Sequence, residues 1–365
     1  MAVFPPSVDN PPTGKNALRI TDMSGCDVEL VGPASRIMVN TPITWHYLAI
    51  TGSDEAVIMI PPYMKREVGV SVLGKIYPSL NLKPLSFLNN ASAAPFSVEQ
   101  AMLINPDVVL SWDYISASFE NVKFPGLVKI AQDDGDKRKL FQVLGELSGR
   151  SERVAWLWSR HQKEMAYLRS TLRNDVKKKK MIILANTDFA LWNNASQPHV
   201  HQWLRQLGGL NLAEKMRFGG GQFRTSAALN LEALLRLDPD LIYINPYALA
   251  FASIDVAEIY TNPKLQGLKA VKNKRIYHMP SGAARLEGPV EEPLFMIWMY
   301  QTMHPELPSA INLRDKIKEA FIDMYHYEMS DREIDDWLRL EENQISNGYD
   351  RFRLVSDDHP APATE

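Results

Sequence analysis

The sequence lacks cysteine pairs, long apolar runs and a large excess of charge. Cys26 is the only cysteine in 365 residues, so no disulfide can form within the chain and no multi-cysteine zinc or iron–sulfur site can be built. No stretch approaches the roughly 18–20 apolar residues that a membrane-spanning helix requires. The formal charge is −3. The longest run of basic residues is residues 177–180, which is typical of a solvated linker and not of a nucleic-acid-binding face.

The signature motifs of common enzyme classes are also missing. The chain has no Gly-x-Gly-x-x-Gly after its first strand, no phosphate-binding P-loop, no Gly-x-Ser-x-Gly elbow and no His-Glu-x-x-His. The glycine run at residues 219–221 lacks the lysine of a phosphate-binding loop. Glu287, Glu291 and Glu292 are expected to be solvated acids of one loop. We therefore expect no catalysis, with a cytosolic α/β enzyme of unknown reaction as the alternative.

The composition is that of a globular protein with room for two lobes. The chain is 45% hydrophobic and 23% charged, and its length exceeds the roughly 100–200 residues of one domain. Residues 19–30 suit a small hairpin, and residues 36–60 read as strand, helix, strand, with the helix stopped near Gly52. This alternation predicts parallel α/β layers.

One helix–strand unit occurs twice in the chain. In the first copy, Ser97 can cap a helix that stops at Asn105-Pro106-Asp107, and a strand follows. In the second, Asn230 can cap a helix that stops at Asp238-Pro239-Asp240, again before a strand. Equivalent residues, such as the two prolines, are 133 positions apart. The repetition predicts two related halves.

An unbroken helical pattern between these copies runs from Ser151 to Asn174, and Ser151 or its neighbour can cap it. At ~1.5 Å per residue, this helix would be about 35 Å long and could span both lobes, which would allow only small closure movements. Further on, we expect a strand at 181–185, a helix over 201–207 ended by two glycines, a strand at 275–279 and a helix over 293–303.

The predicted fold is α/β, with two lobes that each contain a central, mostly parallel sheet flanked by helices. One long rigid helix joins the lobes, and the ligand cleft lies between them. The expected boundaries are 18–150 for the N-terminal lobe, 151–176 for the connecting helix, 177–350 for the C-terminal lobe and 351–365 for a flexible tail.

The order of these segments resembles a known family, the periplasmic binding proteins for iron-siderophores, haem and cobalamin, which share a helical-backbone fold. Each matching stretch is weak alone, but together they span most of residues 18–340 in family order. The matching stretches are GCDVELVGPASRIMV, FSVEQAMLINPDVVLSW, LFQVLGELSGRSERV, WLRQLGGLNLAEK, LNLEALLRLDPDLIYINP, NPKLQGLKAVKNKRIYHMPSG and MYHYEMSDREIDDWL.

The resemblance implies a receptor that delivers its ligand to the membrane subunits of an ABC importer. It also implies a periplasmic location, so an export signal is expected to have been removed before Met1, because residues 1–6 lack a basic segment followed by an apolar one. In this family each lobe presents a surface glutamate to arginines of the importer, and the matching positions are Glu99 and Glu232. Alternatively, each carboxylate simply stabilises the first turn of its helix.

The candidate ligand-binding residues lie in loops that follow the carboxyl ends of predicted strands, where ligands of open parallel sheets bind. Aromatic faces can pack on the apolar parts of a chelate and guanidinium groups can bind its oxygens. Trp45 and Trp112 could instead pack in the core or between lobes, and Arg285 could pair with Glu287 or Asp113. The candidates are Thr44, Trp45, Trp112, Tyr114, Trp192, Arg224, Tyr247 and Arg285.

His199 and His201 offer two imidazoles, whereas a bare metal ion usually needs three or four ligands. One of them could complete the coordination of a chelated metal, and the alternative is a capping or surface role. We expect a monomer without a resident cofactor. The first choice of ligand is a ferric siderophore, with haem, cobalamin or an oxyanion such as molybdate as alternatives.

Overall fold

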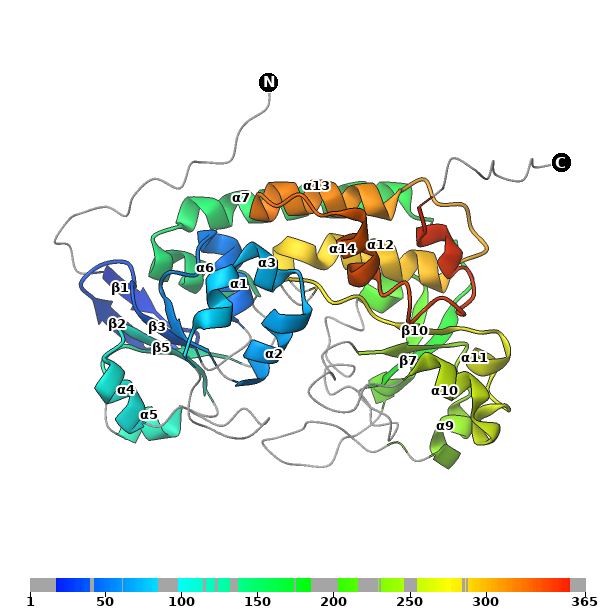
Figure 1. Cartoon of the computed structure of the whole chain (residues 1–365), viewed down its shortest axis with the longest axis horizontal. Helices are drawn as coiled ribbons and strands as arrows, with labels where there is room; N and C mark the ends of the chain where they lie inside the picture. Colours follow the sequence, from blue (N-terminus) through cyan, green and yellow to red (C-terminus); the bar gives the residue numbers. More distant parts are fainter. Residues whose placement is uncertain are drawn as a thin grey trace, which may run out of the picture.

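The computed structural model describes residues 18–39, 43–60, 62–84, 98–113, 116–121, 124–131, 137–173, 175–184, 203–215, 229, 231–245, 255–283, 286 and 288–354. Within these ranges the chain forms two separate four-stranded sheets flanked by helices, and a small antiparallel hairpin (Figure 1). Every pair of neighbouring strands in the two larger sheets is parallel. The predicted α/β fold with two lobes is confirmed.

The N-terminal lobe contains the hairpin and the first sheet. Its strands are β1 (Leu18–Thr21), β2 (Asp27–Leu30), β3 (Ile37–Val39), β4 (Val57–Met59), β5 (Val108–Trp112) and β6 (Leu127–Ile130). Its helices are α1 (Thr44–Thr51), α2 (Pro62–Val70), α3 (Leu73–Ile76), η1 (Pro78–Leu82), α4 (Val98–Ile104), α5 (Ala117–Asn121) and α6 (Lys137–Ser148).

The second sheet belongs to the C-terminal lobe. Its strands are β7 (Lys179–Leu184), β8 (Gly209–Asn211), β9 (Leu241–Ile244) and β10 (Ile276–His278). The helices around it are η5 (Leu212–Lys215), α9 (Leu231–Leu237), α10 (Val256–Thr261), η7 (Pro263–Leu265), α11 (Lys269–Lys272), α12 (Gly288–Met303), α13 (Leu313–Tyr325), α14 (Asp331–Leu338) and η8 (Tyr349–Phe352).

The two sheets have the same strand order. Across the first sheet the order is β4-β3-β5-β6, and across the second it is β8-β7-β9-β10. When the strands of each sheet are numbered along the chain, they therefore lie side by side in the order second, first, third, fourth. This shared topology is the structural counterpart of the 133-residue repeat in the sequence.

The repeated helix–strand junction has the same hydrogen bonds in both lobes. Asn105 and Asp238 end α4 and α9 in the left-handed region, with φ of 51° and 39°. The following Asp107 and Asp240 each bind one backbone residue of the neighbouring strand region, Arg36 just before β3 and Lys180, the second residue of β7. Each aspartate donates its backbone N–H to the carbonyl of that residue, with a nitrogen-to-oxygen distance of 2.8 Å, and its carboxylate accepts the N–H of the same residue. The Pro-Asp pair thus sets the position of each third strand against the first.

Helix α7 (Ser151–Thr171) is continuous, as predicted, although it ends three residues earlier than expected. Arg150 precedes it and no side chain caps it, so the predicted cap by Ser151 or its neighbour is wrong. The helix packs against α1 and α6 of the first lobe and against α12 of the second, and in Figure 1 it runs across both lobes. The predicted lobe boundaries at residues 150, 176 and 350 remain predictions.

Packing continues into the residues expected to form a tail. The side chain of Phe352 is buried, 4.8 Å from the ring of Tyr349, and Arg351 donates hydrogen bonds to three backbone carbonyls. These contacts hold residues 351–352 in place, so the chain is ordered beyond the predicted start of the tail. Residues 355–365 lie outside the described ranges.

Candidate functional site

Three helices that follow the carboxyl ends of strands meet between the lobes. Helices α1 and α6 follow β3 and β6 of the first lobe, and α12 follows β10 of the second. At the start of α12, Gly288 has φ of +66°, and an added Cβ would lie 3.0 Å from the ring of Phe141 and 3.9 Å from that of His46. This close approach requires glycine, and it brings the strand ends of both lobes together.

Lys137 and Trp203 make a second contact between the lobes. Lys137 begins α6, directly after the segment that leaves β6, and Trp203 is the first described residue after β7. The Lys137 ammonium nitrogen lies 4.7 Å from the centre of the Trp203 ring. This nitrogen is shielded from solvent and has no hydrogen-bond partner in the described part of the chain. A shielded ammonium without an acceptor is costly, which favours an anion at this position.

Aromatic rings link α6 to the connecting helix and to α12. Phe141 and Trp158 are in edge-to-face contact at 5.8 Å, and Trp158 and His161 at 5.4 Å. The His161 Nε2 atom is 3.3 Å from a carboxylate oxygen of Glu292 on α12. Arg138 lies over the Trp158 ring at 5.5 Å. The contact between α6, α7 and α12 is therefore aromatic, with the cation of Arg138 on its first-lobe side.

The three candidate ligand residues that the structure describes do not have equal access to a ligand. Trp45 is 2% exposed and donates its indole N–H to Glu67 at 3.1 Å, and Thr44 is fully buried beside Met64. This burial favours the packing alternative for Trp45. Trp112 is half-buried at the carboxyl end of β5. Its equivalent in the repeat is Asn245, which is buried after β9 and donates its backbone N–H to Leu184 at 2.8 Å.

The remaining candidates for ligand or metal binding lie outside the described residues. Their role stays a prediction. They are Tyr114, Trp192, His199, His201, Arg224, Tyr247 and Arg285. Within the described ranges, no group of three or more histidine, cysteine or carboxylate side chains is arranged to hold a metal ion.

Glu291 and Glu292 are not in a solvated loop, as expected from the sequence, but in the first turns of α12, and both are buried. Glu291 accepts hydrogen bonds from the backbone N–H of Ala283 at 2.8 Å and from the Tyr325 hydroxyl at 3.4 Å. Burial, and then the neighbouring Glu291, raises the pKa of Tyr325 well above its ordinary value. Glu291 thus anchors the turn before α12, because a buried carboxylate needs donors.

The two candidate docking residues are exposed on equivalent helices. Glu99 is in the first turn of α4 and Glu232 in the first turn of α9. Glu232 is 79% exposed and lies 3.7 Å from Arg236, one turn further along α9. Figure 1 shows α4 and α9 at the edge of the molecule that is opposite α7 and α13.

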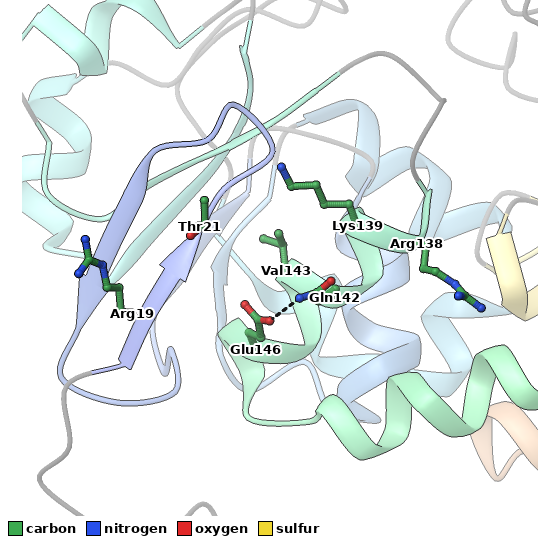
Figure 2. Close-up of a pocket in the computed structure, with 7 residues that line it drawn as sticks. All are labelled: Arg19, Thr21, Arg138, Lys139, Gln142, Val143 and Glu146. Atoms are coloured by element: carbon green, nitrogen blue, oxygen red, sulfur yellow. Dashed lines mark hydrogen bonds between the residues drawn. The ribbon is translucent and has the colours of Figure 1, made fainter.

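A cavity of about 510 Å³ lies between the hairpin and α6 (Figure 2). It is lined by Arg19, Thr21, Arg138, Lys139, Gln142, Val143 and Glu146. Arg19 is already paired with Asp27 at 2.5 Å, and Gln142 with Glu146 at 2.9 Å. Figure 2 shows Lys139 directed towards the hairpin and Arg138 away from it. The cavity is lined by one lobe only, and it shares Arg138 with the contact between the lobes.

Sequence reasoning did not identify Lys137, Trp203, His161 or Glu292 as residues of the inter-lobe contact. A usable signal was present for Lys137, because three consecutive cations at the start of a helix oppose the helix dipole and need an explanation. The other contacts depend on how the lobes pack, which a local pattern does not encode.

Comparisons with known proteins identify the fold. A family model described as periplasmic binding protein matches residues 88–283, and no curated protein matches the chain. A periplasmic solute binding protein from Veillonella parvula is 28% identical, with a TM-score of 0.74, over 90% of this chain and 99% of that one. The ABC transporter solute binding protein from Sulfurospirillum deleyianum is 18% identical, with a TM-score of 0.68 over 88% and 99%.

The molybdate periplasmic binding protein MolA from Haemophilus influenzae is 14% identical in sequence to this chain. Its structure superposes with a TM-score of 0.66 over 86% of this chain and 99% of that one. None of the helices in the described ranges is both long and apolar enough to cross a membrane. The family match covers more than half of the sequence, and the duplicated lobes and connecting helix agree with it. The chain therefore belongs to the periplasmic binding protein family.

Proposed function

We propose that the ligand of this receptor is an anionic metal chelate, specifically a ferric siderophore, bound between the lobes. The observation that carries the proposal is the solvent-shielded ammonium of Lys137, which faces the Trp203 ring and has no acceptor in the described part of the chain. Ferric complexes of catecholate and carboxylate siderophores bear net negative charge and flat groups. An ammonium beside an indole suits both features.

The position of Lys137 supports the same ligand class. It is at the first residue of α6, where the backbone N–H groups and the helix dipole add positive potential. The first turn of α6 contains no acidic residue, whereas Asp133, Asp134 and Asp136 precede it in the sequence. The shielded ammonium of Lys137 itself favours an anion over a neutral ligand such as cobalamin. Arg224 and Arg285, as predicted from the sequence, would supply further cations.

We also propose that Glu99 and Glu232 dock the loaded receptor on the membrane subunits of its importer. Both residues are exposed, they occupy equivalent positions in the two lobes, and their helices lie at one edge of the molecule. Among the described residues, Glu99 has no ion pair, and Glu232 stays 79% exposed beside Arg236. Two separated anionic sites on one edge suit a partner with two equivalent basic sites.

A tryptophan-fluorescence titration tests the ligand class. The purified chain is titrated with a ferric catecholate, a ferric hydroxamate, ferric citrate, haem, cyanocobalamin and molybdate, each in separate series. We expect saturable quenching with an anionic ferric chelate, since Trp203 lies at the inter-lobe contact. In Lys137→Gln, the Kd for that chelate should rise at least about tenfold, because one buried charge contact is lost.

Lys139→Gln is the matched control, because it removes the same charge two residues further along α6, where Figure 2 shows the side chain directed towards the hairpin. Its Kd should stay within about twofold of the parent value, an energy difference well below 1 kcal/mol. Saturation by haem, cobalamin or molybdate and by no ferric chelate would overturn the ligand assignment. Equal Kd values of Lys137→Gln and the parent chain for the ferric chelate would instead show that Lys137 does not contribute to ligand binding.

A further inference from the structure

The helices that present Glu99 and Glu232 also expose apolar side chains beside them. In α4, Met102 is 68% exposed and Leu103 is 87% exposed. In α9, Leu235 is 37% exposed. Three of the ten large apolar side chains that are exposed in the described ranges therefore belong to two helices of seven residues each. Such clustering on short helices is unusual for a surface without a partner.

The apolar residues occupy repeated positions. Met102 and Leu235 are 133 residues apart, like Glu99 and Glu232, and each lies three residues after its glutamate. Side chains three or four residues apart share one helix face, so each glutamate and its apolar neighbour form one patch. The opposite face of each helix is fixed by the core, because Ala101 and Leu234, again 133 residues apart, are fully buried.

We propose that the importer-docking surface consists of two such patches, each a glutamate with an apolar side chain one turn later. The first patch is Glu99, Met102 and Leu103, and the second is Glu232 and Leu235. The occupant is the pair of membrane subunits of the importer, which would contribute a basic side chain and an apolar pocket at each patch. This inference rests on the proposed docking role of the two glutamates.

The two patches differ in their charge and in their number of exposed apolar side chains. The position equivalent to Leu103 is Arg236 in the second lobe, and its guanidinium lies 3.7 Å from Glu232. Glu99 has no ion pair within the described residues. The first patch therefore offers a full negative charge and two apolar side chains, and the second offers a partly compensated charge and one apolar side chain. Docking should depend more strongly on the first patch.

Binding to the importer in nanodiscs tests the proposal, with the Kd measured by biolayer interferometry at low and high salt. We expect Met102→Ser with Leu103→Ser to raise the Kd about tenfold or more, and Leu235→Ser about threefold, in line with the loss of apolar contact area. The effect of Glu99→Gln should shrink in high salt because exposed charges are screened, whereas the effect of the apolar variants should persist.

The matched control is Ile322→Ser, which removes a comparably exposed apolar side chain from α13, at the opposite edge of the molecule in Figure 1. Its Kd for the importer should not change. If the Met102 and Leu103 variant bound the importer with the parent Kd while Glu99→Gln with Glu232→Gln abolished docking, the apolar side chains would have no part in docking. The docking role of the two glutamates would then be kept. Parent-like docking of all variants would overturn the whole surface. The fluorescence titrations of the same variants report ligand binding separately.

Discussion

At the scale of single residues, Glu333 shows how one carboxylate can tie the two lobes. It lies in the first turn of α14 and accepts hydrogen bonds from the Tyr327 hydroxyl and the Lys75 ammonium at 2.7 Å each, and from the backbone N–H of Ser330 at 2.7 Å. Lys75 belongs to α3 of the first lobe. Burial opposes ionisation of Glu333, but these donors outweigh it and lower the pKa from 4.5 to about 2.

Glu333→Gln should lower the free energy of unfolding at pH 7 by about 2 kcal/mol, because a depressed pKa stabilises the folded state wherever the unfolded carboxylate is ionised. In the parent chain this stabilisation is present above pH 4.5 and is lost as the pH falls towards 2. The variant should lack that part of the pH dependence. Urea unfolding monitored by circular dichroism between pH 7 and pH 2.5 measures both effects.

The control for Glu333 is Glu319→Gln, which breaks the exposed pair with Lys316 on α13. It should change the free energy of unfolding by less than about 1 kcal/mol, as is usual for surface ion pairs. Equal stability of Glu333→Gln and the parent at pH 7, with parallel pH profiles, would contradict the assigned role of Glu333.

Residue roles were the hardest feature to predict from sequence. The position of Trp45 after β3 correctly suggested the strand-end region, yet its indole N–H is buried against Glu67 of α2, whose approach no local pattern reveals. Glu291 and Glu292 look like solvated acids because charged residues are rarely buried. The structure buries them against Ala283 and His161, partners that only the packing of α12 supplies.

At the scale of elements, the repeated Pro-Asp junction gives a comparison within one molecule. Asp107 accepts hydrogen bonds from the backbone N–H and the hydroxyl of Ser35 and from the N–H of Arg36, whereas Asp240 accepts from the N–H of Lys180. We expect Asp107→Ala to lower the free energy of unfolding by about 2 kcal/mol and Asp240→Ala by about 1 kcal/mol.

Urea titrations of the two variants under identical conditions measure that difference. Asp107→Asn and Asp240→Asn serve as controls, since an amide oxygen retains one acceptor and should recover part of each loss. If Asp240→Ala proved more destabilising than Asp107→Ala, the number of hydrogen bonds accepted would not be what sets the strength of this junction.

Most elements with strong local signals were predicted, but helices α13 and α14 were not. The alternation of strand and helix, the repeated stops and the unbroken pattern of α7 identified most of both lobes. Helix α12 begins at Gly288, five residues before the predicted start at Pro293. Pro293 looked like a helix start, because proline is a common first residue of a helix. Here Pro293 is inside the helix. Helix α14 was not predicted, although the capping box formed by Ser330 and Glu333 is a readable start signal.

At the scale of the whole molecule, duplication and the connecting helix determine how the lobes can move. Two sheets of equal strand order are held along α7, and α12 packs on the same helix from the second lobe. Two lobes could be predicted from chain length and the 133-residue repeat. The contact of Lys137 with Trp203 could not, because it joins residues that approach only after both lobes have folded and docked.

Continuity of α7 should limit the separation of the lobes. Gln162 and Lys163 are exposed near its middle, so changing both to glycine weakens the helix by about 1 kcal/mol each without removing a core contact. Dyes attached to Leu82→Cys and Leu210→Cys, with Cys26→Ser to remove the exposed native thiol, report the inter-lobe distance by single-molecule energy transfer. The glycine variant should show a broader distance distribution than the parent.

Alanine at positions 162 and 163 is the matched control, because it truncates the same side chains but keeps the preference for helix. Its distance distribution should match that of the parent, since α7 would stay rigid. A glycine variant as narrow as the alanine variant would mean that the packing of α12 on α7 and α13, together with the Gly288–Phe141 contact, holds the lobes even when the helix between them is weakened.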